Sequence, residues 1–139
     1  MRILFAIAAL MLAGPALAQT AAPMTPAQAI AAAKASATGE AEGAFEFVVG
    51  STGGSGFNAY LNSETDYRSP ANLSVELHTA AQNALLARLG ARAEDVLKGK
   101  RIRVKGVARR VPIKNREGAV SYYQTRIDVD AADQIEIVG

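Results

Sequence analysis

The sequence predicts a mainly β domain, a small five-stranded Greek-key barrel with one helix between the third and fourth strands. Apolar and polar residues alternate with a period of two over five separate stretches between residues 45 and 129, which is typical of half-buried strands. Residues 80–89 have helical spacing instead. About a hundred residues carry all of these elements, which is enough for one small core.

The first 18 residues, MRILFAIAALMLAGPALA, have the pattern of a secretion signal. Arg2 supplies positive charge, residues 3–13 form an apolar run, and small residues stand at the cleavage positions ending at Ala18. The run is far shorter than the ~20 residues of a membrane-spanning helix. We therefore expect cleavage after Ala18, a periplasmic or secreted product, and no stable membrane anchor after cleavage.

Composition excludes several kinds of function. Without the signal the chain carries fourteen Lys and Arg against thirteen Asp and Glu, so overall charge does not argue for a polyanionic partner. The chain has no cysteine, which excludes disulfides, iron–sulfur clusters, thiolate zinc sites and thiol chemistry.

Residues 19–43 are rich in alanine and form either a short helix or a mobile arm. Thr25-Pro26 has the pattern of an N-cap followed by proline at the first helical position, ahead of residues 27–37. Ile30 is the only sizeable apolar side chain there, so we expect it to anchor any helix.

The next stretch predicts three strands. They cover residues 45–49, 57–61 and 73–77, and a flexible glycine-rich loop, residues 50–56, separates the first two. In the second strand Phe57 is expected to face inward and Tyr60 outward. In the third, Ser74 and Glu76 are expected to face outward.

A helix and two long strands follow. Thr79 is expected to cap the helix over residues 80–89, Gly90 ends it, and a further turn is expected near residues 94–97. Strands are predicted over residues 100–111 and 119–129, with a short extended segment at 134–138. Gly106 interrupts the alternation, which predicts a bulge or a sharp bend.

Three strands, a helix and two further strands are the element order of an OB-fold. We assign this domain to residues 44–139. A β-sandwich is the competing architecture, but it uses about seven strands and rarely contains an inserted helix.

Several blocks also resemble a known group of proteins. They are YLNSETDYR at residues 60–68, GKRIRVKG at residues 99–106, and QIEIV at residues 134–138. Together they resemble exported bacterial OB-fold domain proteins of unassigned function, similar to modules that accompany some secreted nucleases. The resemblance concerns the fold and implies no catalytic residues.

The strongest functional signal is a basic run. Nine of the nineteen residues from 98 to 116 are Lys or Arg, and none is acidic. On a strand, part of this run forms a stripe on one face, and with an outward tyrosine it predicts a surface that follows phosphates and stacks on bases. The predicted ligand-binding residues are Tyr60, Arg101, Arg103, Lys105, Arg109 and Arg110, with Tyr122 or Tyr123 nearby.

The alternative for the basic run is structural. Asp128 and Asp130 alternate on the last long strand, where they are expected to pair with Arg103 or Lys105. Such pairs stabilise a sheet by about 0.2–1 kcal/mol each and would neutralise the stripe. We favour this alternative because a near-neutral domain rarely binds polyanions strongly.

The sequence predicts no catalytic or metal site and no cofactor. His78 is the only histidine, and a lone histidine without nearby carboxylates makes a poor metal site. Glu64, Asp66 and Arg68 are expected to stabilise their loop locally.

We therefore predict an exported, non-catalytic binding module. Its ligand is expected to be an anionic oligomer, either nucleic acid or acidic glycan, or a periplasmic protein partner. The alternative is an envelope structural or stress protein that recruits a partner by strand addition. An enzyme is the least favoured class, because no nucleophile–base pair can be assembled from the sequence.

Overall fold

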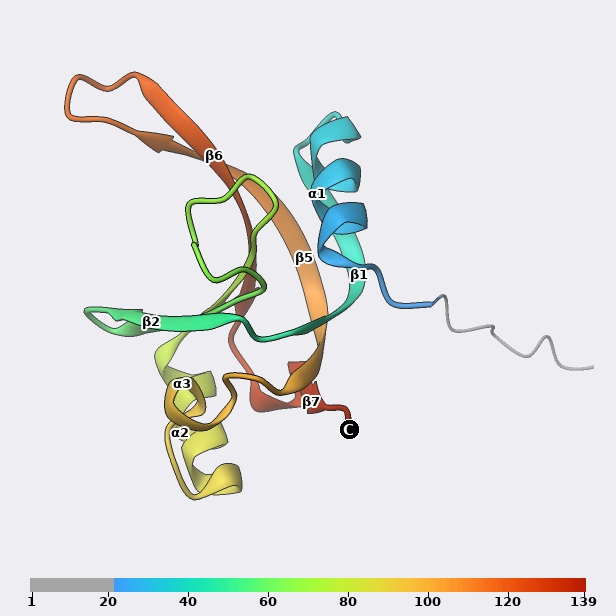
Figure 1. The fold of residues 1–139 in the computed structure, drawn as a ribbon, viewed down its shortest axis with the longest axis vertical. Helices are drawn as coiled ribbons and strands as arrows, with labels where there is room; N and C mark the ends of the chain where they lie inside the picture. Colours follow the sequence, from blue (N-terminus) through green and yellow to red (C-terminus); the bar gives the residue numbers. More distant parts are fainter. Residues whose placement is uncertain (1–21) are drawn as a thin grey trace, which may run out of the picture.

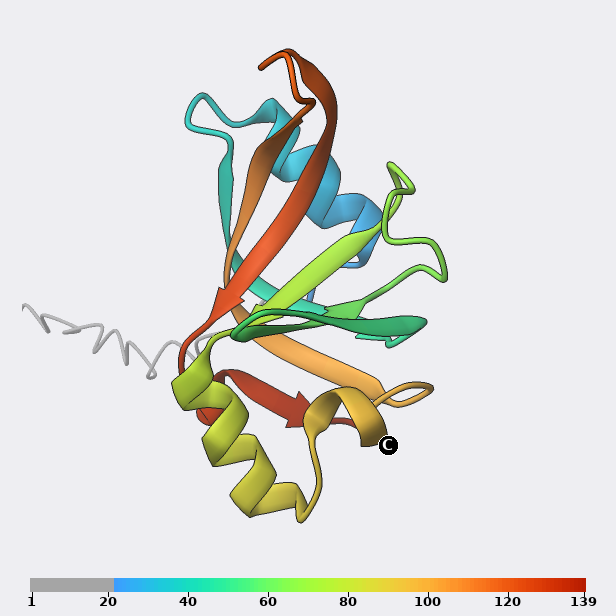
Figure 2. The same ribbon diagram turned by 90° about the vertical axis from the view of Figure 1, so that its left-hand side faces the viewer.

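The structure is a computed structural model that describes residues 22–139. The predicted signal segment lies outside the described residues. The described chain is mainly β, as predicted, with helix α1 (Pro26–Ala35) toward one end and α2 (Thr79–Leu89) and α3 (Ala93–Val96) at the other (Figures 1 and 2). No helix in this part of the chain combines the length and apolar character needed to cross a membrane.

Within residues 22–139, seven strands form one sheet. They are β1 (Glu40–Val48), β2 (Ser51–Ser55), β3 (Asn58–Asn62), β4 (Leu73–Leu77), β5 (Arg101–Lys114), β6 (Val120–Val129) and β7 (Ile135–Ile137), the last preceded by the 3-10 turn η1 (Ala132–Gln134). The prediction of five strands and a single inserted helix is therefore wrong in number. The first predicted strand and the loop after it form two strands, and two helices stand between β4 and β5.

The strand order explains the curled shape of the sheet. The order is β1-β5-β6-β4-β3-β2, with β7 also paired to β5. β4 and β6 run parallel, whereas the other pairs are antiparallel. β1 and β2 stand at opposite ends of this order, yet only Val49 and Gly50 separate them in the chain. The sheet therefore curls until its ends meet at this bend, although strand pairing does not close it.

The core fills the inside of the curled sheet. Phe45, Leu61 and Leu77 contribute fully buried side chains from three strands, and α2 adds Ala81 and Leu85 from one end. Leu73, Val75 and Leu77, which alternate with the outward residues predicted on β4, are also fully buried. Burying a Leu or Phe side chain stabilises a fold by about 1.5–3 kcal/mol, so this core is a major source of stability in a domain without disulfides.

Helix α1 docks on the sheet through small side chains. Thr25 caps it, since its hydroxyl accepts a hydrogen bond from the Gln28 amide at 3.2 Å, which confirms the predicted start. Ala29 and Ala33 are fully buried, whereas Ile30 is only half-buried. The expectation that Ile30 is the anchor is therefore wrong, because alanine lets the helix backbone approach the sheet more closely.

The segment predicted as a flexible loop is strand β2. Its backbone pairs with β3, so that Gly53 lies opposite Tyr60 and Gly54 opposite Ala59. The sequence of β2, STGGS, contains no apolar side chain and so shows no alternation of apolar and polar residues. The sequence pattern therefore missed this strand. Phe57 occupies the tight turn between β2 and β3 and is 88% exposed, not inward-facing as predicted.

Two further local predictions need correction. Thr79 is the first residue of α2, and the N-cap position belongs to His78, which makes no side-chain cap. Gly106 pairs regularly with Gly43 on β1, and the irregularity of β5 lies instead at Ile113 and Lys114. Gly106 stands where β5 passes from pairing with β7 to pairing with β6.

Gly50 is required by a close approach at the bend between β1 and β2. A Cβ atom there would lie 2.8 Å from the carbonyl oxygen of Ser63. The amide of Gly50 also donates to the carbonyl of Asn62 at 2.8 Å. The bend therefore holds the start of the loop over residues 63–72, which forms one wall of the site described next.

Candidate functional site

The outer face of the sheet carries polar side chains in rows set by strand register. One row runs from Asn62 on β3 through Ser74 on β4 to Arg126 on β6. The neighbouring row contains Tyr60 and Glu76 on the first two of these strands. Because outward positions alternate along each strand, residues from distant parts of the sequence share one surface.

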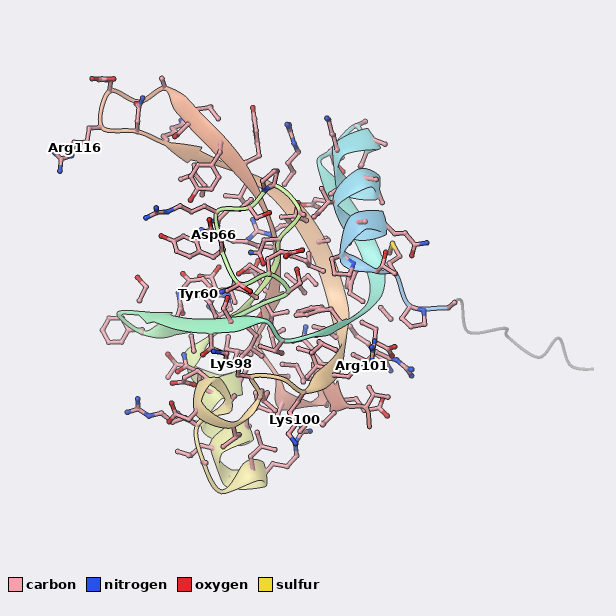
Figure 3. The ribbon with its side chains drawn as sticks, viewed as in Figure 1. Tyr60, Asp66, Lys98, Lys100, Arg101 and Arg116 are labelled. Carbon is pink, nitrogen blue, oxygen red and sulfur yellow. The ribbon has the colours of Figure 1, made fainter. Side chains whose placement is uncertain are left out.

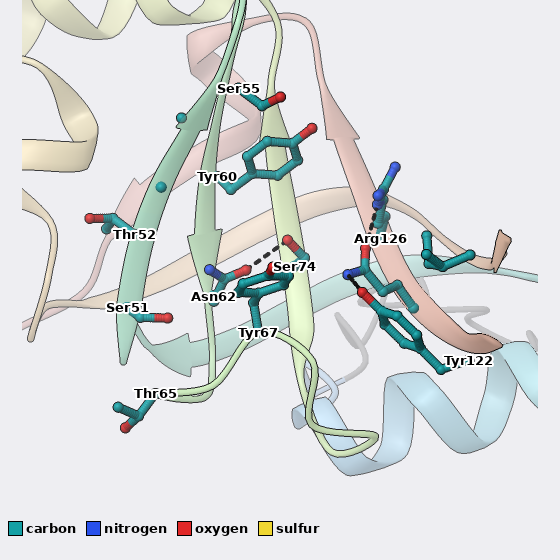
Figure 4. Close-up of a pocket in the computed structure, with 14 residues that line it drawn as sticks. Ser51, Thr52, Ser55, Tyr60, Asn62, Thr65, Tyr67, Ser74, Tyr122 and Arg126 are labelled. Atoms are coloured by element: carbon teal, nitrogen blue, oxygen red, sulfur yellow. Dashed lines mark hydrogen bonds between the residues drawn. The ribbon is translucent and has the colours of Figure 1, made fainter. Parts of the chain in front are cut away.

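A hollow of about 470 Å³ lies over this face (Figure 4). The β2–β3 hairpin, the loop over residues 63–72 and the β5–β6 hairpin supply its walls. Three of the protein's four tyrosines line it, together with one arginine and no carboxylate. The lining residues with side chains are Ser51, Thr52, Ser55, Tyr60, Asn62, Thr65, Tyr67, Ser74, Ile113, Tyr122, Gln124 and Arg126.

Hydrogen bonds hold the floor of the hollow in place (Figure 4). The Ser74 hydroxyl donates to Asn62 Oδ1 at 2.8 Å. On the other side, Arg126 Nε donates to Gln124 Oε1 at 2.9 Å, and Gln124 Nε2 donates to the Tyr122 hydroxyl at 3.2 Å. These amides, hydroxyls and guanidinium are therefore oriented before any ligand arrives, which reduces the entropy that binding costs.

Glu76 supports the hollow from beneath. Its Oε1 accepts from Asn58 Nδ2 at 2.9 Å and from the Tyr60 hydroxyl at 3.4 Å, and its Oε2 lies 3.7 Å from Arg126 Nη1. Glu76 and Ser74 were predicted to face outward, toward solvent. Only 8% of the whole Glu76 residue and 4% of Ser74 are exposed, however. Side chains of neighbouring strands bond to both residues, so their outward direction does not expose them to solvent.

The environment of Tyr60 changes its acidity. Partial burial raises the pKa of the Tyr60 hydroxyl from its ordinary value of 10.0, and the negative charge of Glu76 raises it further. The ring also lies 5.9 Å from the guanidinium carbon of Arg126. Tyr60 is therefore a neutral hydrogen-bond donor with a ring that forms part of the hollow.

The expectation that His78 lacks nearby carboxylates is wrong. His78 Nε2 lies 3.1 Å from Asp128 Oδ1, and one ligand atom from each of Glu76, His78 and Asp128 lies within 4.8 Å of the others. However, Arg109 bonds to Asp128 and Arg126 pairs with Glu76. Two guanidinium groups already compensate both carboxylates, and a divalent cation would have to displace them.

The predicted basic stripe on β5 pairs with a different acid from the one expected. Arg103 Nη2 lies 2.9 Å from Glu46 Oε1, and Arg101 Nη1 lies 3.6 Å from Glu46 Oε2. The reason is register, because β1 lies beside this half of β5 and places Glu46 opposite Arg103. β6 pairs only with the other half of β5, so neither Asp128 nor Asp130 pairs with Arg103 or Lys105.

The six predicted binding residues do not lie together. Tyr60 lines the hollow, whereas Arg101 lies near β7, away from Tyr60 (Figure 3). Lys105 is exposed and Arg109 bonds to Asp128. Arg110 lies with its guanidinium carbon 3.5 Å from the centre of the Tyr123 ring, outside the lining of this hollow.

Sequence reasoning missed most of the hollow. Asn62, Ser74, Gln124 and Arg126 gave no motif, since each is an ordinary outward residue of its strand. Tyr67 stood in a loop that was given only a local role. The useful signal was the set of outward polar residues on β3, β4 and β6, but it becomes a site only when the strand order is known.

Compared with models of known protein families and with curated proteins, the chain matches none.

Proposed function

We propose that this protein is an exported, non-catalytic binding module that holds single-stranded nucleic acid in the hollow on its outer sheet face. One observation carries the proposal: Tyr60, Tyr67 and Tyr122 line a single hollow with Arg126 and no carboxylate. Aromatic rings stack on any base, and the guanidinium of Arg126, although paired with Glu76, is partly exposed and can donate to a phosphate. Export rests on the signal pattern of residues 1–18.

The strand order supports an OB-type barrel as part of this proposal. Counting β1 and β2 as one strand bent at Gly50 leaves five main strands, with β4 and β6 as the parallel pair. The helices α2 and α3 then stand between the third and fourth strands. OB-folds bind oligonucleotides and oligosaccharides on the face of their second and third strands, which here are β3 and β4, the floor of the hollow.

The polar side chains of the hollow favour a ligand with nucleic-acid bases over a ligand made only of sugars. Asn62 and Gln124 present amides, which can donate to and accept from base edges, beside tyrosine rings on which bases stack. The nearby carboxylate of Glu76 is mostly buried and already hydrogen-bonded. An acidic glycan remains the competing ligand and is included in the test.

The test is a fluorescence-polarisation titration of the protein, purified after expression of the full chain, with a labelled single-stranded oligonucleotide of mixed sequence. We expect binding that weakens as salt rises. Tyr67→Ala should weaken it about 5- to 150-fold, because one base–aromatic stack contributes about 1–3 kcal/mol.

The matched control is Phe57→Ala, which removes an exposed aromatic ring outside the lining of the hollow. It should change affinity less than twofold. Absence of binding at low salt, or equal losses in the two variants, would reject the proposal. Binding of an acidic oligosaccharide in preference to the oligonucleotide would reject the nucleic-acid assignment.

Strand addition remains the alternative. Within residues 22–139, β2 and β7 each pair with one strand only, so each has an unpaired edge. A partner added there would bind through backbone hydrogen bonds, and salt would change its affinity little.

A further inference from the structure

A second hollow adjoins the first. It has a volume of about 390 Å³ and lies between α1, the loop over residues 63–72 and the β5–β6 hairpin. Tyr122 lines both hollows, and the same loop contributes to both walls. Its lining residues are Ile30, Lys34, Arg68, Pro70, Arg110, Tyr122, Tyr123 and Thr125.

Three cationic side chains meet at this hollow from three separate elements. Lys34 comes from α1, Arg68 from the loop and Arg110 from β5. None of the three lies within ion-pair distance of a carboxylate in residues 22–139, and no acidic residue lines the hollow. The hollow is therefore a local concentration of uncompensated positive charge.

This lack of ion pairs contrasts with four arginines of β5 and β6. Arg101 and Arg103 share Glu46, Arg109 bonds to Asp128, and Arg126 pairs with Glu76. Lys34, Arg68 and Arg110 make no such pair, although Arg110 directly follows the paired Arg109 on β5.

Tyrosine rings hold two of these cations in place. The guanidinium carbon of Arg110 lies 3.5 Å from the centre of the Tyr123 ring. Arg68 Nε donates to the Tyr67 hydroxyl at 3.2 Å. The nearest acid in the loop, Asp66, accepts from the backbone amide of Arg68 at 2.9 Å. Both guanidinium groups are thus oriented while their charge stays available.

We propose that the second hollow is the phosphate subsite of the same ligand. This inference rests on the proposed function, because it requires a bound oligonucleotide whose backbone passes over Tyr122. A base stacks in the first hollow, and an adjacent backbone phosphate lies among Lys34, Arg68 and Arg110, where guanidinium groups donate charge-assisted hydrogen bonds. The ligand must then carry a phosphate next to the stacked base, and α1 forms part of the binding site.

The experiment compares two probes of the same base sequence. One is single-stranded DNA, and the other is a peptide nucleic acid, which carries the same bases on an uncharged backbone. The test variant is Lys34→Gln/Arg110→Gln, which removes two cations that line only the second hollow. The matched control is Lys98→Gln/Lys100→Gln, which removes two exposed cations beside α3 (Figure 3). Thermal unfolding checks that both variants fold.

We expect the test variant to bind DNA at least tenfold more weakly at low salt. The slope of log affinity against log salt should become shallower by about 0.7, since the subsite holds one phosphate and each phosphate contact on a single strand contributes about 0.7. Affinity for the peptide nucleic acid should stay within twofold, and the control should lower DNA affinity less than twofold.

The outcomes separate this inference from the proposed function. If the unmodified protein binds DNA but the test and control variants lose affinity equally, the phosphate subsite is rejected and the proposed function stands. Equal loss of affinity for both probes in the test variant would also reject the subsite, since a phosphate contact cannot act on an uncharged backbone. If the unmodified protein binds neither probe, both proposals fail.

Discussion

Replacing Glu76 by glutamine should lower stability and raise affinity for single-stranded DNA at the same time. Glu76→Gln keeps the shape of the side chain and an oxygen that accepts from Asn58. It removes the negative charge that lies 3.7 Å from Arg126 Nη1 and places an amide near the guanidinium. The fold thereby loses an ion pair, while Arg126 becomes available to a phosphate in the hollow.

The geometry sets both magnitudes. The exposed fractions of the two side chains are 24% for Arg126 and 10% for Glu76, between an exposed pair at about 0.2–1 kcal/mol and a broken buried pair at about 3–5 kcal/mol. We expect a loss of about 2 kcal/mol, which lowers Tm by roughly 8 °C in a domain of this size. A phosphate roughly 7 Å from the lost charge gains on the order of 1 kcal/mol, or about fivefold in affinity.

Urea denaturation followed by circular dichroism measures the first effect, and fluorescence polarisation with labelled DNA measures the second. The control is Glu42→Gln, which removes the same charge from an exposed position on β1 that makes no ion pair. It should leave stability within 0.5 kcal/mol, as surface substitutions usually do. Unchanged stability in Glu76→Gln would refute the supporting role of Glu76, and weaker DNA binding would refute the assignment of Arg126 to phosphate.

Two further predictions concern the bend and the tyrosine beside Glu76. Gly50→Ala should lower the free energy of unfolding, measured by urea denaturation, by about 1–3 kcal/mol, because its Cβ would lie 2.8 Å from the Ser63 oxygen. The control Gly53→Ala, whose Cβ meets no atom within 4 Å, should lower it less. Equal losses of stability in the two variants would contradict the close approach at Gly50. For Tyr60, the difference between ultraviolet pH titrations of the native protein and Tyr60→Phe should show a midpoint above 10.0, because burial and Glu76 raise the pKa of its hydroxyl. As pH rises, the Tyr60 hydroxyl of the unfolded chain loses its proton before that of the folded protein. The contribution of Tyr60 to stability is therefore present below pH 10 and is lost as pH rises through the folded pKa. A titration midpoint at or below 10.0 would contradict the partial burial of Tyr60.

Several predictions that depend only on neighbouring residues are confirmed, whereas the predicted ion pairs between strands are wrong. Alternation placed Leu73, Val75 and Leu77 correctly in the core, and Thr25 begins α1 as its cap pattern indicates. β1, in contrast, starts at Glu40, earlier than the alternation predicts, because β5 pairs with its first residues.

The site shows the same division more sharply. The sequence alone was sufficient to recognise a mainly β domain, a basic segment in β5 and Tyr60 as an outward aromatic residue, because these properties are local. Only the tertiary structure decided that Arg103 pairs with Glu46, that Tyr60 shares a hollow with Tyr122, and that three other cations stay free of acids. Strand order and register bring these side chains together, and both arise from burying the whole core at once, which no short stretch of sequence encodes.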